Sequence, residues 1–261
     1  ATMQSANWAW MIQILAINFS AVLLLAGTLH LYLFVFAGQK MRLKFDARPM
    51  EKSGRFTFGN QVWDNMFWSL ASGVPIWSAW MILYFWVAAN GWAPSLDSVG
   101  ASPVWFILFF FVIRFWQSFH FYWIHRFIHI PWIFRNVHHL HHRNINVGPW
   151  SGLSMHPVEH VIYLGTVLIH WIVAAHPVHI LFHLQYYALT AATTHTGFEG
   201  LVVKDKNRLR LGTFHHQMHH RYFECNYGSL EIPWDKFFGS FHDGTEAADA
   251  RIKERRKGMM G

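Results

Sequence analysis

The chain has 261 residues, of which 53% are hydrophobic and 18% aromatic, whereas only 13% are charged. Soluble domains carry about twice that share of charged residues, so the composition excludes an ordinary soluble domain and indicates a membrane protein. A single cysteine, Cys225, excludes an internal disulfide framework and a Cys-x-x-Cys site.

Three apolar segments are expected to form long transmembrane helices. Residues 8–37 form the first, which exceeds the ~20 residues needed to cross a bilayer. This segment lacks a basic start and is too long for a secretory leader, so we expect no cleaved signal peptide there. A second uncharged segment covers 66–96, and a third begins near Pro103 and runs into the first histidines.

The 21 Lys and Arg residues fall into three blocks. Six lie at 40–55, four at 114–143 and eleven at 204–257. Cytoplasmic loops of membrane proteins carry such an excess, so the net charge of +7 is explained by topology and nucleic-acid binding is disfavoured. We expect an inner (cytoplasmic) membrane protein with its N-terminus outside, its histidine clusters on the cytoplasmic side and a basic cytosolic tail at 246–261.

A further apolar stretch, 161–194, lies between the histidine clusters and is interrupted by Pro177. We expect a helical hairpin that enters and leaves on the cytoplasmic side. No strand pattern stands out. The expected fold is therefore all-α: an integral membrane helical bundle of three long transmembrane helices plus this hairpin, with a cytosolic histidine-rich di-metal cap. One domain would hold the transmembrane helices at 1–104 and the catalytic histidine region at 105–245.

The histidines carry the strongest chemical signal, since 18 of the 20 lie between positions 120 and 220. Within three clusters they stand three or four residues apart, which on a helix places imidazoles on one face. A neutral imidazole is the commonest side-chain metal ligand, and eight imidazoles exceed the needs of one tetrahedral zinc. The spacing thus predicts two metal ions and these ligands: His125, His129, His138, His141, His142, His216, His219 and His220.

Further polar residues lie close to the clusters. His195, at the end of the hairpin, is expected as an additional ligand. The first arm of the hairpin begins with His156, Glu159 and His160. Two interpretations stay open for these residues: they form a helix start, which Pro157 and Glu159 suit, or they bind the metals or orient a metal ligand. Three histidines off the cluster faces are expected to orient ligands or face solvent: His120, His139 and His215. Isolated histidines are expected to be ordinary surface or core residues: His30, His170, His176, His179, His183 and His242.

Arg114 lies inside the third apolar segment, where an ionised side chain costs several kcal/mol unless it is paired or near water. It precedes His125 by 11 residues, about three helical turns, so both lie on nearly one face together with Ser118. We expect Arg114 and Ser118 to line a substrate cavity leading to the metals. The alternative is an ion pair of Arg114 with Asp64 or another buried acid.

A two-metal site rich in imidazole nitrogen favours oxidation over hydrolysis. Zinc hydrolases use a His-Glu-x-x-His helix, which this sequence lacks, whereas imidazole suits iron equally well. Two ferrous ions with neutral ligands are open to O₂ and can supply the electrons for an oxidant that attacks an unactivated C–H bond. An apolar cavity beside them would hold the substrate and exclude water.

The motifs resemble the fatty acid hydroxylase / sterol desaturase superfamily over about residues 105–245, in these stretches: His-Arg-x-x-His at 125–129, His-x-x-His-His at 138–142, Met-His-Pro-x-Glu-His at 155–160, His-His-x-x-His-His at 215–220, Asn-Tyr-Gly at 226–228 and Trp-Asp-x-x-Phe-Gly at 234–239. The resemblance implies an integral-membrane, O₂-dependent, non-haem di-iron enzyme, with the eight clustered histidines and His195 as ligands. Some members have paired histidines where this chain has His195 and Glu199, so Glu199 is a further candidate. Asn226 and Asp235 are expected to be structural or to orient imidazoles.

The expected function is that of an O₂-dependent di-iron monooxygenase that hydroxylates an aliphatic C–H bond of a lipid-like or amphipathic substrate, with zinc as a replacement metal in purified protein. A desaturase using the same site is the alternative, and a membrane metal transporter or metal-storage protein is the alternative outside the enzymes. The sequence contains no Gly-x-Gly-x-x-Gly, cysteine cluster or His-Pro-Gly-Gly. We therefore expect an external electron donor, a ferredoxin or haem carrier with its reductase, to dock on the basic segment 204–210 and the tail.

Overall fold

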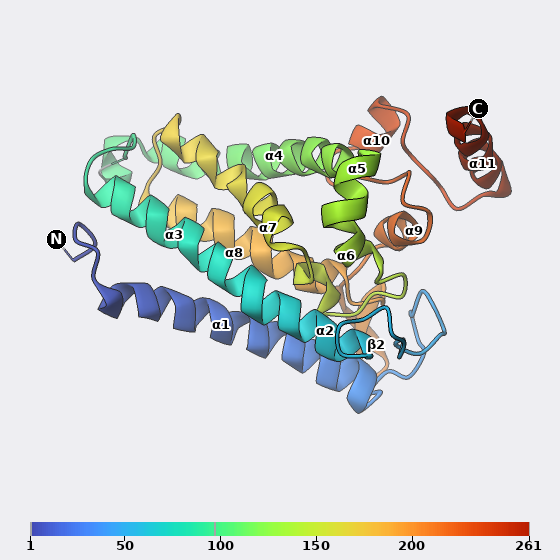
Figure 1. Cartoon of the computed structure of the whole chain (residues 1–261). Helices are drawn as coiled ribbons and strands as arrows, with labels where there is room; N and C mark the ends of the chain where they lie inside the picture. The colour runs from blue at the N-terminus through green and yellow to red at the C-terminus, as the bar shows by residue number, and fades with distance from the viewer. Residues whose placement is uncertain (1, 97, 261) are drawn as a thin grey trace.

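The computed structural model describes residues 2–96 and 98–260 and is predominantly helical (Figure 1). Three stretches are long and apolar enough to cross a membrane, as predicted: Trp8–Val35, Gln61–Ala89 and Pro103–Ile128. The spans are built as follows: α1 (Trp8–His30) with a π-helical turn (Leu31–Val35); α2 (Gln61–Trp68), a π-helical turn (Ser69–Gly73) and α3 (Val74–Ala89); and α4 (Pro103–Ile128).

Each span begins at a residue that favours a helix start. The side chains of Asn7 and Asn60 accept hydrogen bonds from backbone N–H groups in the first turns of α1 and α2, and Pro103 opens α4, where its missing N–H is not needed. The second span therefore begins at Gln61 rather than at Met66, because the asparagine cap, and not the onset of hydropathy, sets the boundary.

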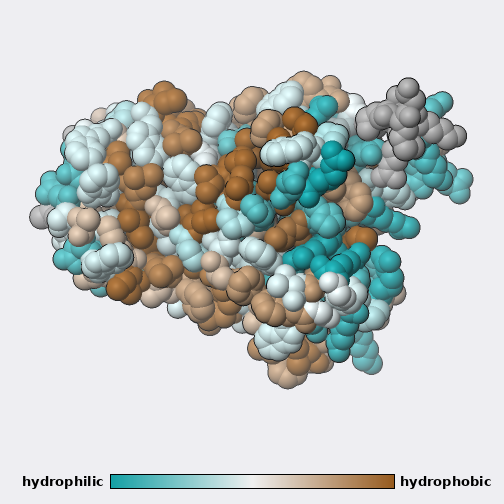
Figure 2. Space-filling view, viewed as in Figure 1, coloured by the Kyte–Doolittle hydropathy of each residue, from teal (hydrophilic) through white to brown (hydrophobic). Residues whose placement is uncertain are grey.

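The long helices lie side by side, and α8 (Pro177–Thr194) packs against α1, α3 and α4 (Figure 1). Their shared core is fully buried at Phe109, Ile113 and Leu184. By contrast, Leu24 and Phe111 are 70% and 68% exposed on the outer faces of α1 and α4. Figure 2 shows hydrophobic residues over much of the helical body and hydrophilic residues gathered at the end that carries α9 and α11. The chain is thus a membrane helical bundle whose apolar outer faces suit contact with lipid.

The predicted hairpin is present, with an irregular first arm. It consists of α7 (Pro157–Leu164), a 3₁₀ stretch (Gly165–Trp171) and, after Pro177, α8. The backbone N–H of Leu96 donates to the carbonyl of Ala175 (3.2 Å), so the tip of the hairpin contacts the loop between the second and third spans. Both arms therefore extend along the bundle, away from the histidine clusters at the opposite end.

A two-stranded antiparallel sheet departs from the all-helical prediction. β1 (Gly200–Val203) pairs with β2 (Lys206–Arg210) through a turn in which Lys204 and Asp205 have positive φ. The side chain of Gln39 anchors β1, accepting from Val202 N and donating to Gly200 O. The basic segment 204–210 is consequently a fixed hairpin. Its strand β2 is exposed along its whole length, which explains why the sequence shows no alternation of apolar and polar residues there.

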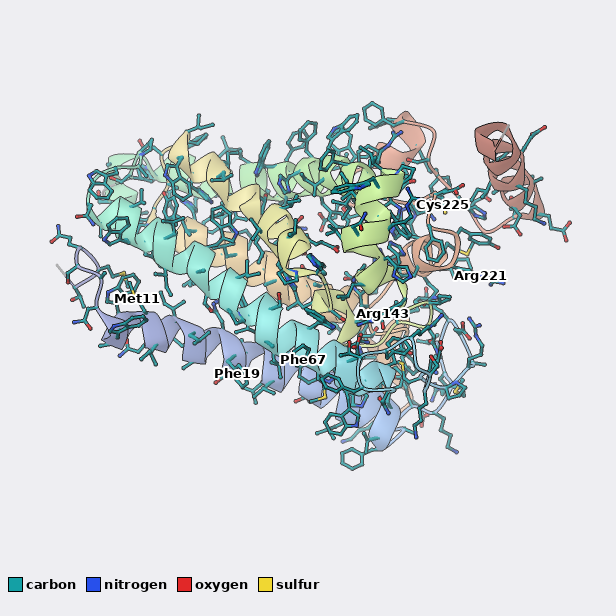
Figure 3. The ribbon with its side chains drawn as sticks, viewed as in Figure 1. Met11, Phe19, Phe67, Arg143, Arg221 and Cys225 are labelled. Atoms are coloured by element: carbon teal, nitrogen blue, oxygen red, sulfur yellow. The ribbon has the colours of Figure 1, made fainter. Side chains whose placement is uncertain are left out.

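Short elements close the histidine-bearing end of the bundle: α5 (Pro131–Ile133), a π-helical turn (Phe134–His138), α6 (His139–His142), a 3₁₀ turn (Ser151–Leu153), α9 (Phe214–Tyr222), α10 (Trp234–Phe237) and α11 (Glu246–Met260); a 3₁₀ turn (Val99–Ala101) lies in the loop before α4. Arg143, just after α6, forms an ion pair with the fully buried Asp64 (2.5 Å), which ties this layer to α2 (Figure 3). These elements hold the functional site against the ends of α4 and α8.

Candidate metal centre

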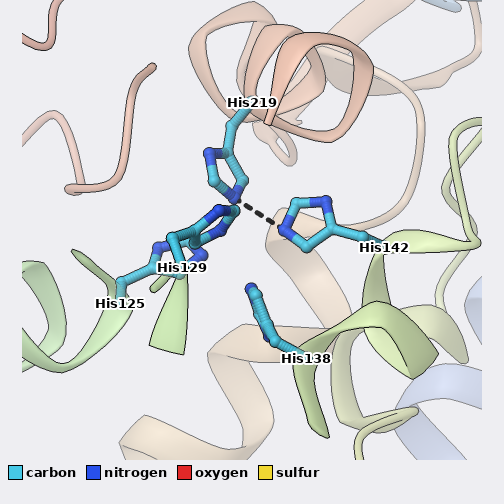
Figure 4. A group of neighbouring side chains, drawn as sticks. All are labelled: His125, His129, His138, His142 and His219. Carbon is cyan, nitrogen blue, oxygen red and sulfur yellow. Dashed lines mark hydrogen bonds between the residues drawn. The ribbon is translucent and has the colours of Figure 1, made fainter. Parts of the chain in front are cut away.

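Nine imidazoles from separate parts of the chain meet where α4 and α8 end. They form two groups, in each of which one ring nitrogen per residue lies within 4.8 Å of all the others: His125, His129, His138, His142 and His219; and His141, His195, His216 and His220. Figure 4 shows the first group with its rings turned toward a common centre. The groups adjoin, since the ring centroids of His141 and His142 are 5.6 Å apart. All eight clustered histidines and His195 are thus brought together.

The His-x-x-His-His spacing divides each motif between the two groups. In the first motif, His138 and His142 belong to one group, while His141 belongs to the other. In α9 the assignment is reversed, because His216 and His220 join the group of His141 and His219 joins the first group. Residues four apart lie nearly one above the other on a helix, and the residue three apart is rotated away from them. Neighbouring histidines in the sequence therefore serve different groups.

Hydrogen bonds behind the rings set the tautomers of five imidazoles. Each of these rings has Nδ1 within hydrogen-bond distance of an acceptor: His125 with Tyr227 O (2.6 Å), His138 with Glu159 Oε1 (2.7 Å), His141 with Ser154 O (3.3 Å), His195 with Ala191 O (2.8 Å) and His219 with Cys225 O (2.6 Å). Four of these partners are backbone carbonyls, which can only accept, so Nδ1 of His125, His141, His195 and His219 carries the proton. His138 faces a carboxyl group, which can accept its Nδ1 proton as well. The Nε2 lone pair is then free for a metal.

The nitrogens at the centre face one another in a way that suits cations. His141 and His195 both have Nδ1 protonated, yet their unprotonated Nε2 atoms lie 3.3 Å apart, where two lone pairs repel. The Nε2 atoms of His129 and His138 are buried without a hydrogen-bond partner among the residues that the structure describes. Such orphaned ring nitrogens are unfavourable unless something fills the space between them. A pair of metal ions satisfies this donor set.

Burial keeps these imidazoles neutral, which is their metal-binding form. It lowers the pKa of His195 to about 4, against the opposing effect of the Ala191 carbonyl. Burial, followed by repulsion between neighbouring imidazoles, also places the pKa well below 6.5 for the following residues: His129, His138, His141, His142, His216, His219 and His220. Protons therefore do not compete with a metal near neutral pH.

Two acidic side chains hold the imidazole groups in place from behind. Glu159, 2% exposed in the first turn of α7, meets His138, and burial raises the pKa of this carboxyl. Asp235 accepts from the backbone N–H groups of Tyr227 and Gly228 (both 2.8 Å). Asp235 therefore fixes the turn that contains the Tyr227 carbonyl, which accepts a hydrogen bond from His125 Nδ1. Asn226 binds backbone groups of His215 and His242, so it holds α9 to the final loop.

The remaining candidates lie outside both groups. His156 caps α7 by accepting a hydrogen bond from Val158 N. Both ring nitrogens of His160 form hydrogen bonds, Nδ1 with the Ser72 hydroxyl and Nε2 with the Leu153 carbonyl. The side chain of Glu199 is exposed, so the structure does not bring it to the site. His139 is also exposed, whereas His215 contacts Asp235 (3.3 Å).

A cavity of about 250 Å³ opens directly onto the imidazoles. Its wall includes His125 and His138 from the first group, together with Arg114 and Ser118. Arg114 does not pair with Asp64; its guanidinium contacts Glu231 and Gln117 instead. Arg114 and Ser118 thus lie in the wall of a cavity between α4 and α8, and its role as a substrate cavity stays a prediction.

Comparisons with known proteins agree with this geometry. The family model for fatty acid hydroxylase matches residues 106–240, which include all nine imidazoles. A probable Delta(7)-sterol 5(6)-desaturase of Neurospora crassa is 26% identical over 92% of this chain and 68% of that protein. Lathosterol oxidase of Mus musculus is 28% identical over 60% of this chain, and Delta(7)-sterol 5(6)-desaturase of Saccharomyces cerevisiae is 28% identical over 57%.

These two alignments cover 54% of the mouse protein and 43% of the yeast protein, so the matched part is about half of each. No solved structure matches the chain. The family model, however, spans more than half of the sequence and coincides with the histidine-bearing part of the fold. The chain therefore belongs to the fatty acid hydroxylase / sterol desaturase superfamily.

Proposed function

We propose that this chain is an O₂-dependent di-iron monooxygenase that hydroxylates an aliphatic C–H bond of a lipid-like or amphipathic substrate. The observation that carries the proposal is the pair of adjoining imidazole groups at the inner end of a cavity between membrane helices. Its relatives are named as sterol desaturases and a lathosterol oxidase, which are oxidoreductases acting on lipids. This supports a hydroxylase or desaturase role for the chain.

In this proposal each imidazole group holds one iron ion, through the nine histidines named above. The first group offers five ring nitrogens, more than a tetrahedral zinc ion takes, which favours iron over zinc. When bound, two ferrous ions would supply the electrons and the oxidant needed to break an unactivated C–H bond. Glu159 and the Tyr227 carbonyl keep the rings of His138 and His125 oriented.

The cavity holds the reacting part of the substrate against the metal end and excludes water. Phe121, Ile124 and Met155 give it an apolar wall, and exclusion of water protects a reactive intermediate from side reactions. We place the site in a single domain spanning 1–261, on the cytoplasmic side of an inner membrane with the N-terminus outside. The basic loops at the histidine-bearing end support this orientation.

Electrons would come from an external carrier with an acidic surface. β2 presents Lys206, Arg208 and Arg210 on a fully exposed strand, a surface suited to electrostatic docking. In turnover with a reduced ferredoxin, Lys206→Glu with Arg208→Glu should raise the KM for the ferredoxin roughly tenfold. Lys52→Glu with Arg135→Glu, two exposed cations outside β2 and the tail, is the matched control. Equal KM values for both variants would remove β2 as the docking surface.

The decisive experiment combines metal analysis with product identification. Protein purified without oxygen should contain two iron ions, and with O₂ and reductant it should add one oxygen atom to a membrane lipid. Loss of two hydrogen atoms instead would establish the desaturase alternative, which the names of the relatives favour. Stoichiometric metal without O₂ consumption, together with metal uptake by vesicles, would establish a transporter and refute both.

A further inference from the structure

We propose that the end of the cavity remote from the imidazoles is a hydroxyl-binding subsite, and that it selects an amphipathic lipid with a neutral hydroxyl headgroup. This inference rests on the proposed function and specifies its substrate class. The subsite consists of Tyr187 together with an Arg114–Glu231 ion pair, all of which line the cavity.

The cavity is long and has two chemically different ends. It lies between α4 and α8, which both end at the metal centre. Arg114 precedes His125 by 11 residues and Tyr187 precedes His195 by eight, which corresponds to about 16 Å and 12 Å of helix. A bound molecule that reaches both ends must therefore be elongated, with its reacting carbon far from its polar group.

Charge at the remote end is already compensated. The guanidinium of Arg114 donates to Gln117 Oε1 (2.6 Å), pairs with Glu231 and lies 3.8 Å from the centre of the Tyr186 ring. An anionic headgroup would have to displace Glu231 from Arg114, and a cationic one would meet the guanidinium. A neutral group, which both donates and accepts, suits this end without disrupting the ion pair.

Tyr187 supplies the second, independent observation. Its side chain lines the cavity and is 6% exposed, yet beyond a weak contact with the Tyr163 side chain its buried hydroxyl makes no close hydrogen bond to the described residues. The ring of Tyr163 stacks on the Tyr187 ring (4.2 Å between centroids) and holds it in place. The Tyr163 hydroxyl donates a hydrogen bond to the backbone carbonyl of Tyr187. Buried hydroxyls are nearly always paired, so a ligand hydroxyl is the missing partner.

The test compares binding of three probes that share one hydrocarbon chain: palmityl alcohol, palmitate and hexadecane. Binding of the radiolabelled probes to the full chain in nanodiscs needs neither iron nor turnover. The wild-type protein should bind palmityl alcohol at least about tenfold more tightly than hexadecane, because only the alcohol pairs the buried hydroxyl. Palmitate should gain no comparable advantage.

Two variants then separate the two parts of the subsite. Tyr187→Phe keeps the ring and should abolish the preference for the alcohol while leaving hexadecane binding unchanged. Glu231→Gln leaves Arg114 uncompensated and should raise the affinity for palmitate about tenfold. Glu246→Gln, in exposed α11, is the control and should bind all three probes as wild type does.

Equal binding of alcohol and hydrocarbon by the wild type, or an undiminished alcohol preference in Tyr187→Phe, overturns the subsite. Either result would leave the oxygenase proposal standing, because lipid oxidation is measured separately. Conversely, an alcohol preference in a protein that carries no iron and oxidises no lipid would uphold the subsite while the proposed function fails.

Discussion

Replacing Glu159 with leucine should weaken iron binding without weakening the metal-free fold. Glu159 accepts from His138 Nδ1 at 2.7 Å, and the two residues are 2% and 1% exposed, so water cannot replace the lost acceptor. Loss of a partner behind a metal ligand typically costs 10–100-fold in affinity, or about 1.4–2.7 kcal/mol. Full burial of this contact places Glu159→Leu toward the upper part of that range.

The small expected effect on the stability of the metal-free protein makes this prediction specific. The second carboxyl oxygen of Glu159 has no partner among the described residues, and burying such a group costs about 1–3 kcal/mol. Leucine fills similar space without that cost, but it leaves the buried Nδ1 of His138 without its partner, so the two effects offset each other and the metal-free variant should unfold at nearly the wild-type temperature. Glu159→Gln, which keeps an acceptor oxygen, is the control and should retain most of the affinity.

Anaerobic competition of the protein with a ferrous chelator measures the affinity, and thermal unfolding of the chelated protein measures stability. Wild-type iron affinity in Glu159→Leu would refute the idea that this carboxyl supports a ligand. A large drop in the unfolding temperature of the metal-free variant would instead show that Glu159 matters for folding, and the affinity loss would then have no specific meaning.

Three further predictions test the site. His141→Ala should lose most iron and all turnover, whereas His242→Ala, whose ring contacts Asp249 rather than the cluster, should lose neither in metal analysis and assay. Gly152→Ala places a Cβ 2.0 Å from the Ala191 carbonyl oxygen, so it should displace the end of α8 and lower the unfolding temperature; an unchanged temperature would contradict that contact. The metal-free protein should lose stability as pH falls from 6.5 toward 4, by about 1.4 kcal/mol per pH unit from His195 alone. The reason is that the unfolded chain protonates near 6.5, while folded His195 protonates only at about 4; a flat unfolding profile over this range would refute it.

The spacing of apolar runs and histidines was enough to predict the spans and the imidazoles that converge. Periodicity and residue type encode these features directly, as for the run that became α1 and the motif at 138–142. The acceptors behind the rings are different, because Ser154, Cys225 and Tyr227 act through backbone carbonyls that any residue possesses. Only the path of the chain brings those carbonyls to the site.

Two other outcomes depended on tertiary contacts. Arg114 was recognised as needing a partner, but Glu231, 117 residues later, carries no mark that distinguishes it from other acids in the sequence. Likewise Glu199 was a candidate through the family resemblance, yet its exposed side chain indicates a surface role. The β-hairpin was missed because β2 is exposed throughout, so neither of its faces had to be apolar and its sequence lacks the alternation that predicts a strand.

The division of each motif between the two imidazole groups implies that the two halves of the centre form together. α6 and α9 each contribute rings to both groups, so neither group can assemble unless both helices are in place. Ordering these helices around the first cation has an entropic cost, and the second cation then finds its ligands already positioned. In the proposed di-metal centre, the adjacent pairs His141–His142 and His219–His220 would therefore couple two metal sites, a role that spaced histidines around a single site could not have.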